Sequence, residues 1–226
     1  MRNCSLCDQP ILLQSGQRVC SYCGLTEEGD HTCSQGHYLC QACRTALPSE
    51  LMARVCGNSK ESDPCALADL LQSHPVFNQM GPQYHVVTGP VMVTVLANLC
   101  KLPDKQRAIA DAIERSKDVP ALACAQRGVC GAAASAGTAI ALLTNAGPLK
   151  ARERSLAIAT TARALQKIAD QSGIRCCRQS VYASIAAVLE VLGQELGIHV
   201  TAKTPACRYH SRVADCKKEG CPYFPT

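Results

Sequence analysis

The stretch GVCGAAASAGTAIALLTNAGPL, residues 128–149, contains no charged residue in 22 positions and consists largely of alanine and glycine. Its length would allow it to cross a membrane. Its small side chains favour a different interpretation, because helices rich in Ala and Gly let neighbouring helices approach closely. We therefore predict a buried, closely packed helix over residues 128–145, and no membrane span.

The composition of the whole chain also favours helices. The chain has 226 residues, of which 47% are hydrophobic, but it has no tryptophan and only two phenylalanines. This length and composition allow one mid-sized core with a small appendage. Because that core must be built from Ala, Leu, Ile and Val, it suits packed helices better than a β-sandwich.

Five segments with helical patterns follow residue 84, and they are separated by stretches whose Pro and Gly residues end helices. They cover residues 85–100, 105–117, 128–145, 152–171 and 176–196. Two shorter helical patterns lie in a linker region at 46–83, and the second has Ser62 or Asp63 as its N-cap and Pro64 in its first turn. The prediction is a mainly α fold whose central part, residues 84–198, is a bundle of about five helices.

Residues 1–45 are rich in Cys and Gly and too poor in apolar residues to form a core unaided, so we predict that metal stabilises this module. Three Cys–Cys pairs have two intervening residues and one Cys–His pair has three. Such spacing lets both members of a pair bind the same zinc ion. The eight predicted ligands, enough for two tetrahedral zinc ions, are Cys4, Cys7, Cys20, Cys23, Cys33, His37, Cys40 and Cys43.

These ligands can be combined in two ways. Numbered in chain order, the pairs are Cys4 with Cys7, Cys20 with Cys23, Cys33 with His37, and Cys40 with Cys43. Sequential sites would join the first pair to the second and the third pair to the fourth. A cross-braced arrangement, of the zinc-ribbon or treble-clef kind, would join the first pair to the third and the second to the fourth. We favour the cross-brace, because Cys40 and Cys43 precede a helical stretch. As a further alternative, His31 could replace Cys33.

A second set of candidate residues lies at the N-terminal ends of three predicted helices. A helix N-terminus carries partial positive charge and free amides, and nearby arginine adds to its effect in lowering the pKa of a thiol. If short connections make the helices run up and down, these three ends lie at one end of the bundle. The set comprises candidate catalytic residues His85, Cys124, Cys130, Cys176 and Cys177 and candidate substrate-binding residues Arg127, Arg175 and Arg178.

The C-terminal tail, residues 199–226, supplies three more candidate metal ligands, Cys207, Cys216 and Cys221. Three cysteines make an incomplete four-ligand site, so the fourth ligand must come from elsewhere in the chain or from a bound molecule. The tail is just long enough to return to the thiol-rich site, or it closes a separate metal site. For Cys56, Cys65 and Cys100 we predict only a space-filling role in the core.

Five stretches occur together in an order that matches a known family: CSQGHYLCQAC (33–43), MGPQYH (80–85), CAQRGVCGAAASAG (124–137), RCCRQS (175–180) and an ending with CPYF (221–224). They resemble a cysteine-rich domain family of unknown function from anaerobic bacteria and methanogens. In that family the domain occurs alone or attached to radical-SAM or methyltransferase-type domains. The resemblance implies a radical-SAM or methyltransferase-type partner protein, and it supports the candidate site residues more than any one reaction.

Two functions follow from these residues. The first is a metal-dependent enzyme of sulfur, methyl or redox chemistry in anaerobic metabolism, which uses an iron–sulfur cluster such as 4Fe–4S, or thiolates, beside a structural zinc module. The alternative is a non-catalytic protein, either a zinc-braced adapter or a carrier that delivers metal or sulfur to a partner enzyme.

Composition and the N-terminal sequence exclude or disfavour other classes. The net charge of +5 is mild and aromatic residues make up 4%, so little is available to attract and stack nucleic acid. The N-terminal sequence lacks the apolar region of a secretory signal. Seventeen cysteines in such a chain indicate metal and redox chemistry in a reducing cytoplasm, and not a disulfide framework.

Overall fold

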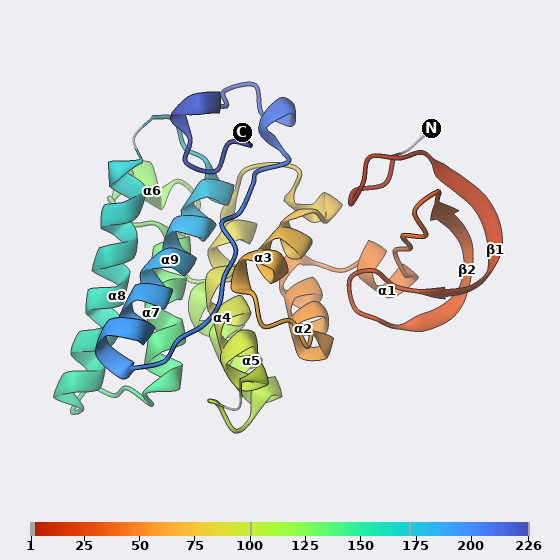
Figure 1. Ribbon diagram of the computed structural model, residues 1–226. Helices are drawn as coiled ribbons and strands as arrows, with labels where there is room; N and C mark the ends of the chain where they lie inside the picture. The colour runs from red at the N-terminus through yellow and green to blue at the C-terminus, as the bar shows by residue number, and fades with distance from the viewer. Residues whose placement is uncertain (1–2, 100, 172, 226) are drawn as a thin grey trace.

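The computed structural model describes residues 3–99, 101–171 and 173–225. A small N-terminal module with a β-hairpin lies beside a larger helical body, and the C-terminal tail passes along that body to one of its ends (Figure 1). The predicted mainly helical fold is confirmed. Cys100, which the sequence predicts to fill space in the core, lies outside the described residues.

The N-terminal module is built around one antiparallel pair of strands. Strand β1 spans Ile11–Val19 and pairs with strand β2, Thr26–Cys33. Most of their side chains are exposed, so the hairpin has little core of its own. The short helix α1, Gln41–Arg44, follows, with Cys40 as its N-cap. Cysteines therefore stand at the ends of regular elements, where a metal can join them.

The two short helical patterns of the linker region form helices α2, Pro48–Asn58, and α3, Pro64–Gln72. Asp63 is the N-cap of α3, because its carboxylate accepts hydrogen bonds from the backbone N–H groups of Cys65 and Ala66. Pro64 occupies the first turn, as predicted. Two 3-10 turns, η1 at Pro75–Phe77 and η2 at Pro82–Val86, lead into the body.

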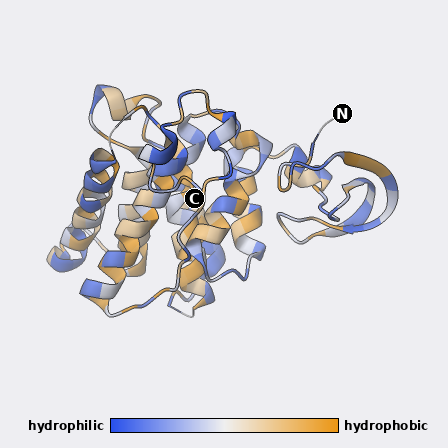
Figure 2. Cartoon of the chain, turned by 45° about the horizontal axis from the view of Figure 1, so that its top comes forward, coloured by the Kyte–Doolittle hydropathy of each residue, from blue (hydrophilic) through white to orange (hydrophobic). Residues whose placement is uncertain are grey.

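Within the described residues, the body contains five longer helices, each of which closely overlaps one of the predicted segments. They are α4 (Thr88–Asn98), α5 (Lys105–Ser116), α7 (Gly131–Leu143), α8 (Ala151–Asp170) and α9 (Cys177–Leu196). The short helix α6, Ala123–Gln126, precedes α7. Apolar residues are concentrated in these helices (Figure 2), and one continuous core joins them to α2 and α3.

Helix α7 packs against α4, α5, α8 and α9, which explains its small residues. A Cβ atom on Gly137 would lie 2.1 Å from the Oγ1 of Thr161 and 2.8 Å from the carbonyl oxygen of Ala157, so only glycine allows α8 to approach this closely. The uncharged stretch is therefore a buried packing helix. Within the described residues, none of the helices combines the length and hydropathy needed to span a bilayer.

The C-terminal tail leaves α9 at Gly197, which has a left-handed backbone conformation with φ of 64°. It then runs back along the body (Figure 1), where the backbone N–H of Lys203 donates to the carboxylate of Asp63. Two further 3-10 turns, η3 at His210–Arg212 and η4 at Lys218–Gly220, follow. This course brings the tail cysteines back to the N-terminal end of α9.

Candidate functional site

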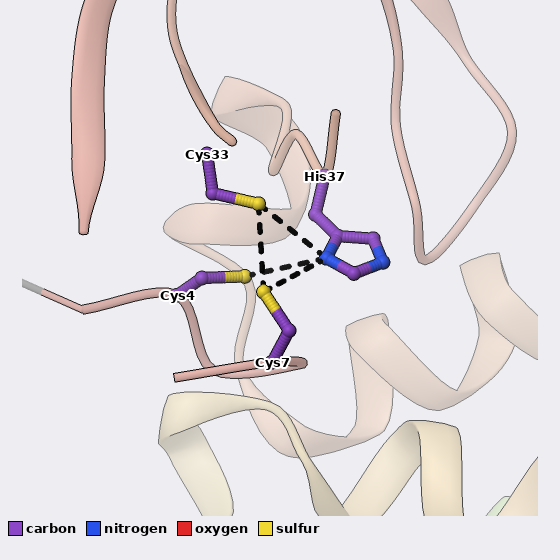
Figure 3. A group of neighbouring side chains, drawn as sticks. All are labelled: Cys4, Cys7, Cys33 and His37. Carbon is purple, nitrogen blue, oxygen red and sulfur yellow. Dashed lines mark hydrogen bonds between the residues drawn. The ribbon is translucent and has the colours of Figure 1, made fainter. Parts of the chain in front are cut away.

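Three cysteines and one histidine of the N-terminal module point at a common centre (Figure 3). Their ligand atoms, the Sγ of Cys4, Cys7 and Cys33 and the Nδ1 of His37, all lie within 4.8 Å of one another. The Sγ atoms of Cys7 and Cys33 are 3.6 Å apart, and the Nδ1 lies 3.3 to 3.6 Å from the three sulfurs. Zn–S bonds of about 2.3 Å in a tetrahedron require S–S distances of about 3.8 Å, so these four atoms fit one zinc ion.

A second group of four sulfurs lies deeper in the same module and consists of Cys20, Cys23, Cys40 and Cys43, all of them buried. The Sγ atoms of Cys23 and Cys40 are 3.7 Å apart, which is also the spacing that a single zinc ion requires. The backbone N–H of Cys43 donates to the Sγ of Cys40 at 3.3 Å. Such N–H donors stabilise a metal-bound thiolate.

The two groups correspond to the cross-braced pairing. The first Cys–Cys pair meets the Cys–His pair, and the second meets the pair at the start of α1. His31 belongs to neither group, because its Nδ1 bonds to the carboxylate of Asp30 at 2.6 Å. Two cysteine-rich groups of four ligands near the N-terminus can therefore hold metal ions such as zinc.

The module contacts the helical body through Tyr22. The hydroxyl of Tyr22 forms hydrogen bonds of 2.8 Å with the hydroxyls of Ser5 and Ser73, and its ring packs edge-on against His74. Next to Ser5 in the chain, the carbonyl oxygen of Leu6 accepts a hydrogen bond of 2.8 Å from the guanidinium of Arg208 in the tail. The module is thus held by both α3 and the tail.

A cavity of about 290 Å³, hereafter the larger cavity, lies where η2, α7 and α9 begin. All five candidate catalytic residues line it: His85, Cys124, Cys130, Cys176 and Cys177. Cys130 and Cys176 are the N-caps of α7 and α9, whereas His85 lies in η2 just before α4. The structure therefore brings together the three helix ends that the predicted topology places side by side.

His85 is held in one orientation by the backbone. Its Nδ1 lies 3.0 Å from the carbonyl oxygen of Val119, so the neutral ring donates its proton there and leaves Nε2 as an acceptor. Burial, together with the charge of Arg175, lowers the pKa of His85 below its ordinary value. The ring is therefore neutral near pH 7 and can accept a proton at Nε2.

Gly131, the first residue of α7, leaves room for the His85 ring. A Cβ atom at this position would lie 2.1 Å from the Cγ of His85, so Gly131→Ala is expected to displace the ring and break its bond to Val119. The expected loss in the free energy of unfolding is about 1–3 kcal/mol, as for other overpacked sites. Urea unfolding measures this loss, and the NMR shifts of the His85 ring report the displacement.

Gly147→Ala is the matched control, because no described heavy atom lies within 4 Å of a Cβ built there. It should leave both the free energy of unfolding and the His85 shifts unchanged. If Gly131→Ala behaves like this control, the packing of His85 against α7 is not as described.

Cys176 and Cys177 do not have the lowered pKa values that the sequence predicts. Burial raises the pKa of Cys177 to about 11 and outweighs the opposing charge of Arg175. Burial also raises the pKa of Cys176, although backbone N–H groups of Arg178 and Gln179 oppose it. Desolvation is the larger effect for these two thiols, so they are neutral near pH 7.

The three candidate substrate-binding arginines lie in different places. Arg175 and Arg127 are both exposed, but only Arg175 lines the larger cavity. Arg178 is 4% exposed and donates to the carbonyl oxygens of Gln72 and Phe77 at 2.7 and 2.8 Å. Of the three arginines, only Arg175 is therefore in a position to contact a molecule in the larger cavity.

A second cavity of about 40 Å³, hereafter the tail cavity, lies between the tail and the start of α9. It is lined by four cysteines: Cys176, Cys207, Cys216 and Cys221. The sequence leaves the fourth ligand of the tail open, and in the structure Cys176 is the cysteine that lines this cavity together with the three tail cysteines. Cys176 lines both cavities, whereas Cys177 faces only the larger one.

Several polar groups around the tail cavity find no hydrogen-bond partner in the part of the chain that the structure describes. They are the Nε of Arg178, the Nε2 of Gln179 and the hydroxyl of Tyr209. The guanidinium of Arg178 also stacks on the ring of Tyr209, 3.6 Å from its centroid. Buried polar groups are almost always paired, so these point to a bound group. Nothing in the sequence pattern singles out Gln179 or Tyr209.

The two other described cysteines are buried in helices away from these sites. Cys56 lies in α2 and Cys65 in α3, and burial raises the pKa of each to about 12. Neither lines the larger cavity or the tail cavity.

Residues 52–224 match the model of a protein family described as a family of unknown function (DUF5714). No curated protein and no solved structure matches the chain. The matched range contains every residue that lines the larger cavity and the tail cavity. It leaves out the eight N-terminal candidate ligands and the stretch 33–43, on which part of the resemblance rests.

Proposed function

The chain belongs to DUF5714, a family of unknown function, and from the chemistry of the larger cavity and the tail cavity we propose that it is an iron–sulfur enzyme that performs thiol and redox chemistry. The observation that carries the proposal is the tail cavity, where three tail cysteines meet Cys176. The larger cavity, which shares Cys176, is then the place of reaction.

The four cysteines of the tail cavity suit an iron–sulfur cluster better than a zinc ion. Among the described residues, the groups whose ligand atoms all lie within 4.8 Å of one another are the two N-terminal ones, so the four sulfurs of the tail cavity are not all within that distance of one another. A 4Fe–4S cluster needs such separation, because each thiolate binds a different iron. A cavity between the four cysteines is also expected for a cluster.

The surroundings of these sulfurs suit an anionic cluster. The backbone N–H of Lys218 donates to the Sγ of Cys216 at 3.4 Å. Burial raises the pKa of Cys207, and a hydrogen bond from the backbone N–H of Tyr209 opposes this effect. Hydrogen bonds to cluster sulfurs tune the reduction potential. The buried positive charge of Arg178 lies in the same wall. These groups would offset the negative charge of four thiolates.

The N-terminal module, residues 1–45, has a structural role in this proposal. Each of its two groups offers four protein ligands, and closed four-ligand zinc sites stabilise a fold without leaving a position for substrate. The hydrogen bond from Arg208 to the carbonyl oxygen of Leu6 would then attach the tail to this treble-clef-like, cross-braced module. The module thus supports the tail that supplies three of the four cluster ligands.

In the larger cavity the protein's own groups would act on the substrate. Cys130 and Cys177 present thiols, and His85 can take a proton at Nε2 because its Nδ1 is bonded to Val119. A bound cluster would supply one-electron redox chemistry next to these thiols. Cys176 in the shared wall places that chemistry beside the substrate.

The proposal is tested on protein purified without oxygen. We expect brown protein with visible charge-transfer absorption and about four iron and four sulfide per chain, as a 4Fe–4S cluster contains. Cys176→Ser should abolish most of the absorption, because one of four cluster ligands is lost. Cys124→Ser is the matched control, since Cys124 is exposed and does not line the tail cavity. Colourless protein that holds only zinc would contradict the proposal and favour the adapter or carrier alternative.

A further inference from the structure

We infer that the larger cavity binds a small organic monoanion, a carboxylate with an apolar body, whose carboxylate lies between Arg175, Gln179 and the start of α7. The inference names the substrate class of the reaction cavity and in that respect rests on the proposed function. It is carried by the charge, the unpaired donors and the size of the cavity.

Among the described residues that line the larger cavity, the permanent charge is positive. Among the described residues that line it, Arg175 is the only one with a permanent charge, and none is Asp or Glu. The cavity therefore attracts an anion and offers nothing to hold a cation by charge.

Gln179 supplies an unused hydrogen-bond donor. Its side chain is 7% exposed, lines the larger cavity and the tail cavity, and its Nε2 is without a partner in the described chain. Leaving a buried amide unpaired costs about 1–3 kcal/mol, so an acceptor bound in this wall would recover that cost. A carboxylate oxygen is such an acceptor.

The N-terminus of α7 adds further donors. Its N-cap, Cys130, forms no side-chain cap, and the first backbone bond of the helix runs from Ala134 to the carbonyl oxygen of Cys130. The amides of the residues between them have no partner within the helix. Ala132, one of these residues, lines the cavity, so the positive end of the helix faces the same space as Arg175 and Gln179.

The remaining walls and the volume define the rest of the ligand. Much of the lining is apolar and includes Ala121, Leu122, Ala125, Ile168, Ala169 and Ile174. A volume of about 290 Å³ lies at the small end of ligand cavities, which suits a short-chain or single-ring molecule. One arginine balances one negative charge, and its planar fork matches a carboxylate. An inorganic phosphate dianion would need a second cation.

Benzoate serves as the probe, with benzamide as its uncharged match and inorganic phosphate as the competing anion. Ligand-observed NMR titration should show that benzoate binds and that benzamide and phosphate bind at least about tenfold more weakly. Arg175→Gln should weaken benzoate binding by about tenfold or more, because a charge-assisted pair is lost. Arg127→Gln should leave it unchanged, since Arg127 is exposed and off the cavity.

Equal binding of benzoate and benzamide, preference for phosphate, or equal effects of the two arginine variants would overturn the inference. Iron and sulfide are measured on the same samples. Benzoate binding without iron would refute the iron–sulfur proposal and leave the anion site standing. A full cluster without benzoate binding would refute the anion site and leave the iron–sulfur proposal standing.

Discussion

Cys43→Ser is expected to release one of the two zinc ions that the N-terminal module is predicted to hold, and to unfold the part of the module around that site while the helical body stays folded. The reason is that this module has little apolar core, so the free energy of metal binding is largely its free energy of folding. Structural zinc sites contribute about 10–16 kcal/mol at pH 7, far more than any single contact in the module. Cys43 is 0% exposed, so a serine hydroxyl there has no access to water in compensation.

Metal analysis after dialysis against a weak chelator should give about two zinc ions for the unmodified chain and one for Cys43→Ser. Hydrogen exchange of the β1 and β2 amides should become fast in the variant, whereas α7 and α9 should stay protected. Cys56→Ser is the matched control, because Cys56 is also 0% exposed but lies in α2 outside both ligand groups. It should lose stability and keep both ions. Protected strand amides in zinc-depleted Cys43→Ser protein would show that metal does not hold the module together.

The parts of the site that the sequence predicts are those set by local spacing. Pairs such as Cys20 and Cys23 must lie close together whatever the fold, because two residues separate them. The helix starts are also local, as the Asp63 cap of α3 shows. The common cavity follows from connectivity, because short links between helices bring alternate N-termini to one end.

What the sequence does not predict depends on burial and on side-chain direction. A helix N-terminus and Arg175 both favour a thiolate at Cys177, yet packing of η2 and α7 over this end raises its pKa instead. The direction of the Arg178 side chain is explained by helix geometry only once the buried face of α9 is known. Val181 and Tyr182, three and four residues later, are buried, so Arg178 shares their face of α9. Its carbonyl partners are more than a hundred positions away in the chain.

Arg178 joins the start of α9 to the end of α3, to η1 and to the tail. It lies in the first turn of α9 and donates to the carbonyl oxygens of Gln72, at the end of α3, and Phe77, in η1. Its guanidinium stacks on Tyr209, which lies two residues after the candidate ligand Cys207. Since a buried guanidinium requires partners, these contacts both stabilise the charge and hold the tail over α9.

Arg178→Met is therefore expected to lower the free energy of unfolding by about 3–5 kcal/mol. Methionine keeps the apolar stem but removes two charge-assisted hydrogen bonds, each contributing about 1.5–3 kcal/mol, and the stacking on Tyr209. Urea unfolding measures the loss. Hydrogen exchange of the Cys207 amide, which donates to the carbonyl oxygen of Tyr223, reports whether the tail has loosened.

Arg212→Met is the matched control. Arg212 also links the tail to another part of the chain, through a 2.9 Å ion pair with Asp8, but both side chains are about half exposed or more. Exposed pairs contribute at most about 1 kcal/mol, because water and salt screen them. The Arg178 variant should thus lose several times more stability than the Arg212 variant and alone should expose the Cys207 amide. Equal losses would mean that burial of Arg178 does not hold the tail in place, and the four-cysteine cavity would then need another support.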